Sequence, residues 1–220
     1  MGFEYLTNVP LAQARKEYLE RLVSGGFGSK TETIPVFESC GRVTAKAVYA
    51  HICAPHYAAS AMDGVAVSAK ETFGATETTP VTLKPDQFLV LDTGDPIPED
   101  KDAVIMVEDI VKNGDGSITI HAAAAPWQHI RQIGEDVCAG EMILPSHMTV
   151  SPAAIGAMIA GGVLEIEVIR KPVVGIIPTG DEIIPPCTDP KPGDILEFTG
   201  SIFSAMVRSW GAEAVVYPII

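Results

Sequence analysis

The first regular pattern of apolar and polar positions is helical. Between residues 10 and 23, Leu11, Ala14, Tyr18 and Leu22 recur at helical spacing, with charged residues on the opposite side. The spacing predicts an amphipathic helix that ends at the glycine-rich stretch beginning with Gly25.

From about residue 55 to residue 121 the pattern changes to short apolar runs separated by glycine, proline, aspartate and asparagine. Several short strands at close spacing are typical of a β-rich unit. The stretch Asn113–Gly116 predicts the turn of a hairpin. The runs that predict strands are Val65–Val67, Val81–Leu83, Phe88–Leu91, Ala103–Val107 and Ile118–Ile120.

A second helix is predicted over Pro152–Ala160. Ser151 is its expected N-cap, and proline is favoured at the first helical position. Gly161 ends the helix, and the alternation of apolar and charged residues in Leu164–Ile169 predicts a half-buried strand.

The last segment predicts a βαβ unit. Val173–Ile177 is continuously apolar, as expected of a strand buried on both faces of a parallel sheet. A helix over residues 201–210 and an apolar run over residues 214–220 follow it. One crossover unit cannot cover both faces of a parallel sheet, so we expect this chain to be the amino-terminal part of a longer protein, or another subunit to complete the sheet.

Composition narrows the function classes. The 220 residues are 47% hydrophobic with a net charge of −13, which opposes non-specific binding to nucleic acid and to anionic membranes. The four cysteines form no C-x-x-C pair, which disfavours a zinc ribbon or a redox motif. Residues 1–6 lack the basic and apolar regions of a signal peptide, so a cytoplasmic location is predicted.

Four short motifs place a carboxylate beside glycine or proline, which holds the charge on a turn rather than on a helix face. Such turns, spread over much of the chain, suggest parts of one site or one interface. They are Ser60-Ala61-Met62-Asp63-Gly64, Thr93-Gly94-Asp95-Pro96-Ile97-Pro98, Arg131-Gln132-Ile133-Gly134-Glu135-Asp136 and Pro178-Thr179-Gly180-Asp181-Glu182.

Each motif, taken singly, has a structural interpretation beside a functional one. A turn aspartate such as Asp63 commonly caps backbone N–H groups. The loop at Thr93 is either an ordinary β-turn or a cradle of N–H groups for an oxyanion. Arg131 forms either a structural ion pair or a clamp for an anion. The turn at Gly180 follows a predicted parallel strand, where ligands of open α/β sheets bind.

Taken together and in order, these motifs resemble the molybdopterin molybdenumtransferases, the MoeA family, to which the E domain of gephyrin belongs. Gly41-Arg42-Val43, Pro55 and Gly140 extend the match, which covers residues 8–220. The resemblance implies insertion of molybdenum from molybdate into adenylylated molybdopterin with release of AMP, assisted by Mg²⁺. It also implies an elongated homodimer, whose active cleft is shared between subunits, and a possible contact with the adenylyltransferase that supplies the substrate.

The resemblance further implies a multi-domain α/β fold. An elongated mixed α/β first domain, residues 1–52 and 138–171, holds an inserted β-rich domain, residues 53–137. Residues 172–220 begin a Rossmann-like three-layer α/β domain. Because the rest of that domain would lie beyond Ile220, we expect this chain alone to be inactive.

Carried over residue by residue, the family's functional positions fall on the four motifs. Thr93 and Arg131 would donate to the oxyanion, while the carboxylates would orient Mg²⁺ or water and accept protons; which of them hold metal stays open. The implied catalytic residues are Asp63, Thr93, Arg131, Asp136 and Glu182, and the implied substrate-binding residues are Ser60, Gly94, Thr179, Gly180 and Asp181.

Three departures from the family pattern leave an alternative open. Val65 replaces an aromatic residue, Ala58-Ala59 replaces Asp-Asn, and Glu197-Phe198-Thr199 replaces Asp-Ser-Asn. The substitutions at Ala58-Ala59 and Glu197-Phe198-Thr199 favour a scaffold or regulatory module of the same fold, as gephyrin's E domain also anchors receptors. The five retained catalytic positions favour the enzyme.

Overall fold

The computed structural model describes residues 8–220. The segment on which the signal-peptide prediction rests lies outside the described residues. The chain forms two compact units. Unit 1 comprises Met1–Ala47, Leu144–Ile155 and Glu165–Ile220, and unit 2 comprises Val48–Ile143 and Gly156–Leu164. The predicted boundaries of three domains stay a prediction.

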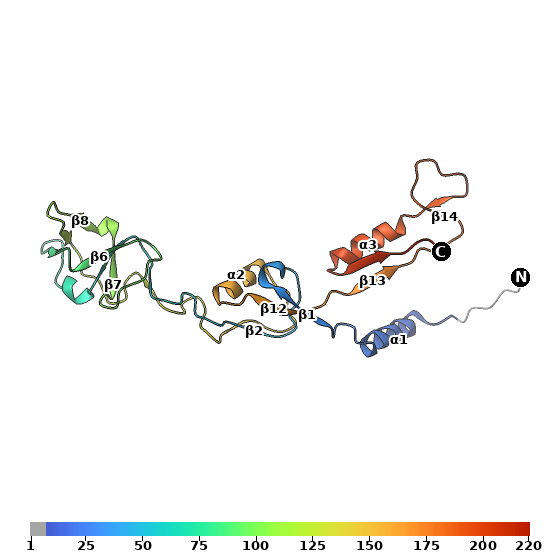
Figure 1. The fold of residues 1–220 in the computed structure, drawn as a ribbon, viewed down its shortest axis with the longest axis horizontal. Coiled ribbons are helices and arrows are strands. Elements are labelled where there is room, and N and C mark those ends of the chain that lie inside the picture. The colour runs from blue at the N-terminus through green and yellow to red at the C-terminus, as the bar shows by residue number, and fades with distance from the viewer. Residues whose placement is uncertain (1–7) are drawn as a thin grey trace, which may run out of the picture. The chain divides into compact units, whose positions relative to one another are not determined.

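Unit 2 contains the β-rich region that the short apolar runs predict (Figure 1). Strand β4 lies between β6 and β7 in one antiparallel sheet, and β9 lies between β5 and β8 in another. The predicted turn at Asn113–Gly116 joins β8 to β9, which pair antiparallel as a hairpin. The bounds are β4 Gly64–Val67, β5 Val81–Leu83, β6 Phe88–Leu91, β7 Ala103–Met106, β8 Ile110–Lys112 and β9 Ile118–Ile120.

The core of this region lies on both faces of β4, all of whose residues are buried. Side chains alternate across a strand, so Val65 and Val67 join one apolar cluster and Ala66 joins another. The first cluster includes Ile120 of the second sheet. Gly64 is necessary at the start of β4, because a Cβ there would lie 2.0 Å from the carbonyl oxygen of Ile105.

Short elements complete unit 2. Strand β3 pairs with β10, and β2 pairs with β11. The bounds are β2 Val48–Tyr49, β3 Ala59–Ser60, β10 Ile130–Arg131 and β11 Met142–Leu144, with 3₁₀ turns η2 at Ala69–Thr72 and η3 at Val107–Asp109.

The helices confirm the periodic patterns. Helix α1 spans Leu11–Ser24 and buries none of its residues, although its spacing is amphipathic. Helix α2 spans Pro152–Ala160, and the hydroxyl of Ser151 accepts a hydrogen bond from the N–H of Ala154 at 3.2 Å, as an N-cap does. None of the helices within residues 8–220 combines the length and hydrophobicity needed to cross a membrane.

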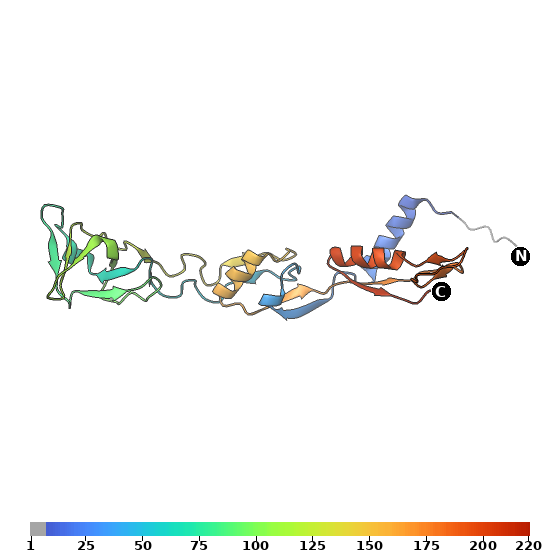
Figure 2. The same ribbon diagram turned by 90° about the horizontal axis from the view of Figure 1, so that it is seen from above.

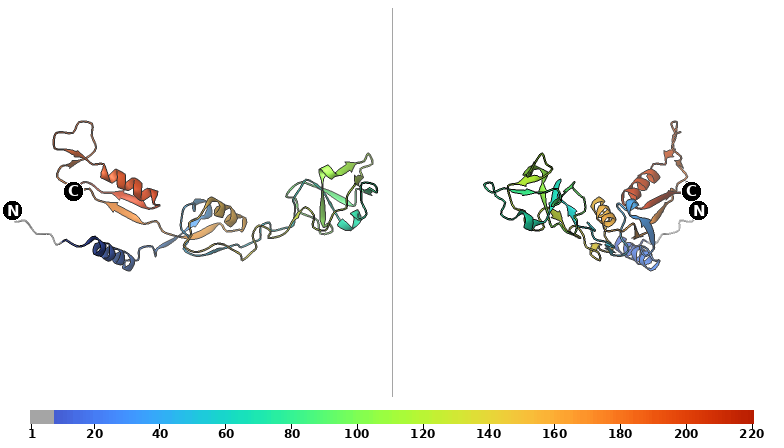
Figure 3. Two further views of the ribbon diagram at one scale, coloured as in Figure 1. Left: turned by 180° about the vertical axis from the view of Figure 1, so that it is seen from behind. Right: turned by 60° about the vertical axis from the view of Figure 1, so that its left-hand side comes forward.

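Unit 1 contains an antiparallel strand pair and a βαβ unit. Strand β1, Thr31–Pro35, precedes the 3₁₀ turn η1, Val36–Glu38, and pairs with β12, Glu165–Ile169. Strand β13 runs parallel to β16, and α3 connects them and packs along both (Figures 2 and 3). The βαβ elements are β13 Val173–Ile176, β14 Ile183–Ile184, β15 Ile195–Leu196, α3 Thr199–Ser209 and β16 Glu213–Val216.

Helix α3 begins two residues before the predicted start. The Glu197 carboxylate accepts a hydrogen bond from the N–H of Gly200 at 2.7 Å, which satisfies a free donor of the first turn. Glu197 is one of the three residues that replace the family's Asp-Ser-Asn sequence, and its side chain therefore stabilises the start of α3.

The prediction that Val173–Ile177 is buried on both faces is wrong for this structure. Val173 is 61% exposed and Ile177 is 55% exposed. The β13–β16 sheet has only two strands, and one helix can cover only one of its faces. A continuous apolar run therefore predicted the strand correctly and its burial incorrectly.

Candidate active site

Three of the four predicted motifs meet at the short strand β3 in unit 2. The backbone N–H of Ser60 donates to the carbonyl of Asp95 at 2.9 Å, and the N–H of Gly94 donates to the carbonyl of Ser60 at 2.9 Å. On its other side β3 pairs with β10, so that Ala59 lies opposite Arg131. One two-residue strand thus joins the first motif to the second and the third.

Asp63 and Thr93 are joined directly by side-chain chemistry. Oδ1 of Asp63 accepts hydrogen bonds from the backbone N–H of Thr93 at 2.7 Å and from its hydroxyl at 2.8 Å. The backbone bond, followed by the hydroxyl bond, lowers the pKa of Asp63 below its ordinary value. Asp63 is therefore ionised at neutral pH, and it fixes the loop that carries Thr93.

The Thr93 loop uses its N–H groups internally. Thr93 donates to Asp63, Gly94 donates to Ser60, and the N–H of Asp95 donates to the carbonyl of Asp92 at 3.1 Å. In this conformation the loop does not offer a cradle of donors to an oxyanion. The predicted donation by Thr93 also requires its hydroxyl to leave Asp63. The β-turn interpretation describes the loop as it stands.

Arg131 is held by the carboxylates of its own motif. Its Nη2 donates to Oδ1 of Asp136 at 2.5 Å, and its Nε lies 3.7 Å from Oε1 of Glu135. The hydrogen bond to Asp136, followed by the charge of Asp136, raises the pKa of Arg131. The guanidinium remains half-exposed, so Asp136 orients it while other N–H groups face solvent. This arrangement combines the predicted ion pair with the geometry that a clamp needs.

Ser60 and Gly94 have different accessibilities. Ser60 is fully buried, and its hydroxyl donates to the carbonyl of Met62 at 2.6 Å. In this conformation its hydroxyl supports the turn that carries Asp63 and is not available to a substrate. Gly94 is exposed, with φ of +93°, and its carbonyl accepts a hydrogen bond from the Tyr57 hydroxyl at 2.9 Å.

The fourth motif belongs to unit 1. After β13, the N–H of Ile183 donates to the carbonyl of Gly180 at 3.1 Å and closes a turn. Gly180 has φ of +150°, a value that favours glycine. Thr179, Asp181 and Glu182 are exposed on this turn. The predicted catalytic residues are therefore divided between the units, with Glu182 in unit 1 and the other four in unit 2.

Sequence reasoning missed the residues that lead into Arg131. Trp127 and His129 both have left-handed backbones, with φ of +66° and +54°. The carbonyl of His129 accepts a hydrogen bond from the N–H of Ala61 at 2.9 Å, next to the paired strands. Bulky residues rarely adopt a left-handed backbone, so the sequence gives no signal that Trp127 and His129 would do so.

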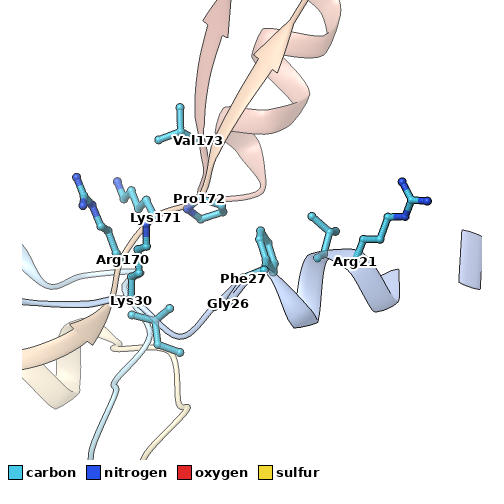
Figure 4. A pocket seen from close by; sticks show the side chains of 12 residues that line it. Arg21, Gly26, Phe27, Lys30, Arg170, Lys171, Pro172 and Val173 are labelled. Carbon is cyan, nitrogen blue, oxygen red and sulfur yellow. The ribbon is translucent and has the colours of Figure 1, made fainter. Parts of the chain in front are cut away.

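Unit 1 also contains a basic cavity of about 590 Å³ that none of the predicted site residues lines. Residues from the ranges 21–30 and 169–173 line this cavity, and the N–H of Arg170 donates to the carbonyl of Lys30 at 2.9 Å, which joins the two segments. Phe27 of the first segment and Pro172 of the second also line it (Figure 4). Its cationic residues form no ion pair within the described residues. They are Arg21, Lys30, Arg170 and Lys171.

Comparison with known proteins identifies a family for the chain. Residues 9–162 match the family model described as the MoeA N-terminal region, domains I and II. The chain belongs to this family.

Particular relatives can be named. The chain is 36% identical over 199 residues to molybdopterin molybdenumtransferase 2 of Mycobacterium tuberculosis, covering 83% of this chain and 49% of the relative. It is 34% identical to the molybdopterin molybdenumtransferase of Haemophilus influenzae, covering 79% and 45%. The chain thus spans about half the length of these relatives. The crystal structure of a molybdopterin biosynthesis moeA protein from Pyrococcus horikoshii superposes with a TM-score of 0.77 at 30% identity, covering 87% of this chain and 55% of that one.

Proposed function

We propose that the protein containing this chain inserts molybdenum from molybdate into adenylylated molybdopterin and releases AMP. Family membership and the names of the relatives support the reaction class. The single observation that carries the assignment of residues is the meeting of Asp63, Thr93 and the Arg131–Asp136 pair around β3. An anion-binding guanidinium and ionised carboxylates are the groups that this chemistry requires.

The residues have distinct proposed roles. Arg131, oriented by Asp136, binds an anionic oxygen of molybdate or of the substrate phosphate. The ionised Asp63 accepts the proton of a dithiolene thiol as its sulfur binds molybdenum, and passes it to the displaced oxide, which takes up two protons and leaves as water. Thr93 positions Asp63 and releases its hydroxyl to the substrate when the substrate binds. The catalytic role of Glu182, on the turn after β13 in unit 1, stays a prediction.

The carboxylates also fit Mg²⁺. The described residues contain no cluster of three metal-ligating side chains. Mg²⁺ commonly takes only one or two protein carboxylates together with substrate phosphates and water. Both bonds from Thr93 go to Oδ1 of Asp63, which leaves Oδ2 for an ion, and Asp136 likewise uses Oδ1 for Arg131. A bound Mg²⁺ would neutralise phosphate charge.

The wider assembly is part of the same proposal. The β13–α3–β16 unit begins a Rossmann-like domain, and the protein is a cytoplasmic homodimer that receives its substrate from the adenylyltransferase. The parallel strand pair supports the first point, and the largely exposed apolar face of α1 supports the second. Sedimentation of the chain at tens of micromolar tests the dimer, and a monomer alone would contradict it.

The activity is tested in a chimera in which residues 9–162 replace the matching region of the Mycobacterium tuberculosis relative. We expect the chimera to insert molybdenum and Asp63→Asn or Arg131→Ala to lower the rate by at least about 100-fold. Asp115→Asn is the matched control. Asp115 also accepts bonds from an N–H and a hydroxyl, both of Ser117, but it lies in the hairpin turn and belongs to none of the four motifs.

Equal losses in the Asp63 and Asp115 variants would assign both carboxylates to folding and contradict the site. Full activity of both Asp63→Asn and Arg131→Ala would contradict it as well. A folded but inactive chimera would favour the scaffold alternative that the substitutions at Ala58 and Ala59 leave open.

A further inference from the structure

Two of the four free cysteines face each other across paired segments of unit 2. Ala54 and Val137 exchange both backbone hydrogen bonds, at 2.8 and 3.2 Å, which makes them a hydrogen-bonded antiparallel pair. Cys53 precedes Ala54 and Cys138 follows Val137, which are the places of the next pair in an antiparallel register. Such a pair is of the non-hydrogen-bonded type, in which the Cα atoms lie about 4.5 Å apart. This separation falls inside the range that a disulfide spans, about 4.4–6.8 Å.

The two sulfur atoms also lie near one point of the structure, beside Gly134. A Cβ placed on Gly134 would lie 2.8 Å from Sγ of Cys138 and 3.6 Å from Sγ of Cys53. The thiol of Cys138 donates to the carbonyl of Gly134 at 3.4 Å, and Sγ of Cys53 accepts from the N–H of Ala139 at 3.3 Å. Both side chains therefore point to one side, over the residue that has no side chain of its own.

We propose that Cys53 and Cys138 are a disulfide-forming thiol pair, an oxidation site that joins the two segments leading into and out of the β-rich region. With a disulfide oxidant such as oxidised glutathione, one protein thiolate attacks the oxidant and releases one glutathione thiol. The second protein thiolate then displaces the other glutathione from the mixed disulfide. Two protein thiols are oxidised, and one oxidant molecule is reduced to two thiols.

The position of the pair gives the oxidation a consequence. The new bond would close residues 54–137 into one loop, which restricts the unfolded chain. Gly134, which both sulfurs approach, belongs to the motif that carries the Arg131–Asp136 pair, and Asp136 is two residues from Cys138. Oxidation would therefore fix the backbone that holds the guanidinium.

The remaining cysteines supply a matched control. The C40S/C187S chain keeps only the proposed pair, and the C53S/C138S chain keeps only Cys40 and Cys187, both of which are exposed. After incubation with oxidised glutathione, we expect the first chain to lose two thiols and to give an intramolecular peptide link between residues 53 and 138. The link should form at least about tenfold faster than any link in the second chain, because the folded protein holds the thiols together.

Two further measurements complete the test. Dithiothreitol should restore both thiols, and the melting temperature reported by Trp127 should be higher for the oxidised than for the reduced chain. In the unsubstituted chain, peptide mapping should give the same link as the main product. The proposal is overturned if the sulfurs form only separate glutathione adducts, if links form only between chains, or if both chains form links at the same rate.

Discussion

Strands β4 and β13 have nearly the same composition and very different surroundings. The first reads Gly-Val-Ala-Val and is buried along its whole length, whereas the second reads Val-Val-Gly-Ile and is largely exposed. Strand β4 is the central strand of a three-stranded sheet with apolar clusters on both faces, while β13 has one neighbouring strand and one helix. The number of packed layers, and not the apolar run, decides how much surface leaves water and hence how much stability a strand contributes.

This comparison predicts its largest difference for a pair of isoleucines. Ile120 is fully buried in the β-rich region, and Ile177 follows β13 with 55% exposure. Ile120→Ala should lower the free energy of unfolding of unit 2 by about 3–4 kcal/mol through lost burial and a cavity. Ile177→Ala should cost unit 1 less than about 1 kcal/mol.

Urea unfolding followed by tryptophan fluorescence measures the two effects separately. Trp127 reports on unit 2 in the W210F chain, and Trp210 reports on unit 1 in the W127F chain. Similar losses for both isoleucines would show that β13 is covered in solution.

A second pair of variants adds a methyl group instead of removing atoms. Gly64→Ala places a Cβ 2.0 Å from a backbone oxygen inside the sheet, which should cost about 2–3 kcal/mol because the sheet must shift. At Gly175 the nearest atom, 3.0 Å away, belongs to the ring of Tyr217, which is half-exposed and can move. Gly175→Ala should therefore cost less than about 1 kcal/mol. Equal shifts of the two urea midpoints would disprove the contrast.

Hydrogen exchange should show which of the two regions opens more readily, without any substitution. Amides of β13 and β16 should exchange at least about tenfold faster than those of β4 and β7, because fewer buried contacts oppose local opening. A non-specific protease at low concentration should first cleave residues 185–193, between β14 and β15. First cleavage within residues 64–120 would reverse the ranking.

The smallest expected effect is on the pH dependence of stability. Each unit has a carboxylate with a lowered pKa that can be substituted to measure it. The pKa of Asp63 is lowered by its hydrogen bonds from Thr93, and that of Glu167 by its bond from Lys46 and then from Thr31. A lowered pKa contributes stability that is complete above the unfolded-state pKa, about 4, and is lost as pH falls through the folded-state value. Asp63 is exposed and Glu167 is partly exposed, so solvent screening keeps the contribution small.

Asp63→Asn should therefore lower the melting temperature of unit 2 by about 1–3 °C at pH 6 and by less at pH 3, with no change in unit 1. Glu167→Gln should affect unit 1 in the same way and spare unit 2. Melting curves recorded by the two tryptophan probes check both directions. A difference that grows on acidification would refute the stated sign.

Local patterns were sufficient to predict the regular elements. The spacing of Leu11 and Tyr18 predicted α1, Ser151 and Pro152 predicted the start of α2, and Asn113–Gly116 predicted the hairpin. The ordered turn motifs likewise predicted the family. Each signal for an element depends on residues within a few positions of one another, where backbone preference and capping act. The family signal instead needed the order of all four motifs along the chain.

Tertiary structure alone decided burial and bonding partners. The exposure of Val173, the burial of Ser60 and the bond from Thr93 to Asp63 all depend on residues far away in the sequence. The proximity of Cys53 and Cys138 also depends on distant residues, because the two cysteines are not in a C-x-x-C motif that would predict it. Local sequence determines which conformations a segment prefers, but only the packing of distant segments determines which surfaces leave water and which polar groups remain free to act.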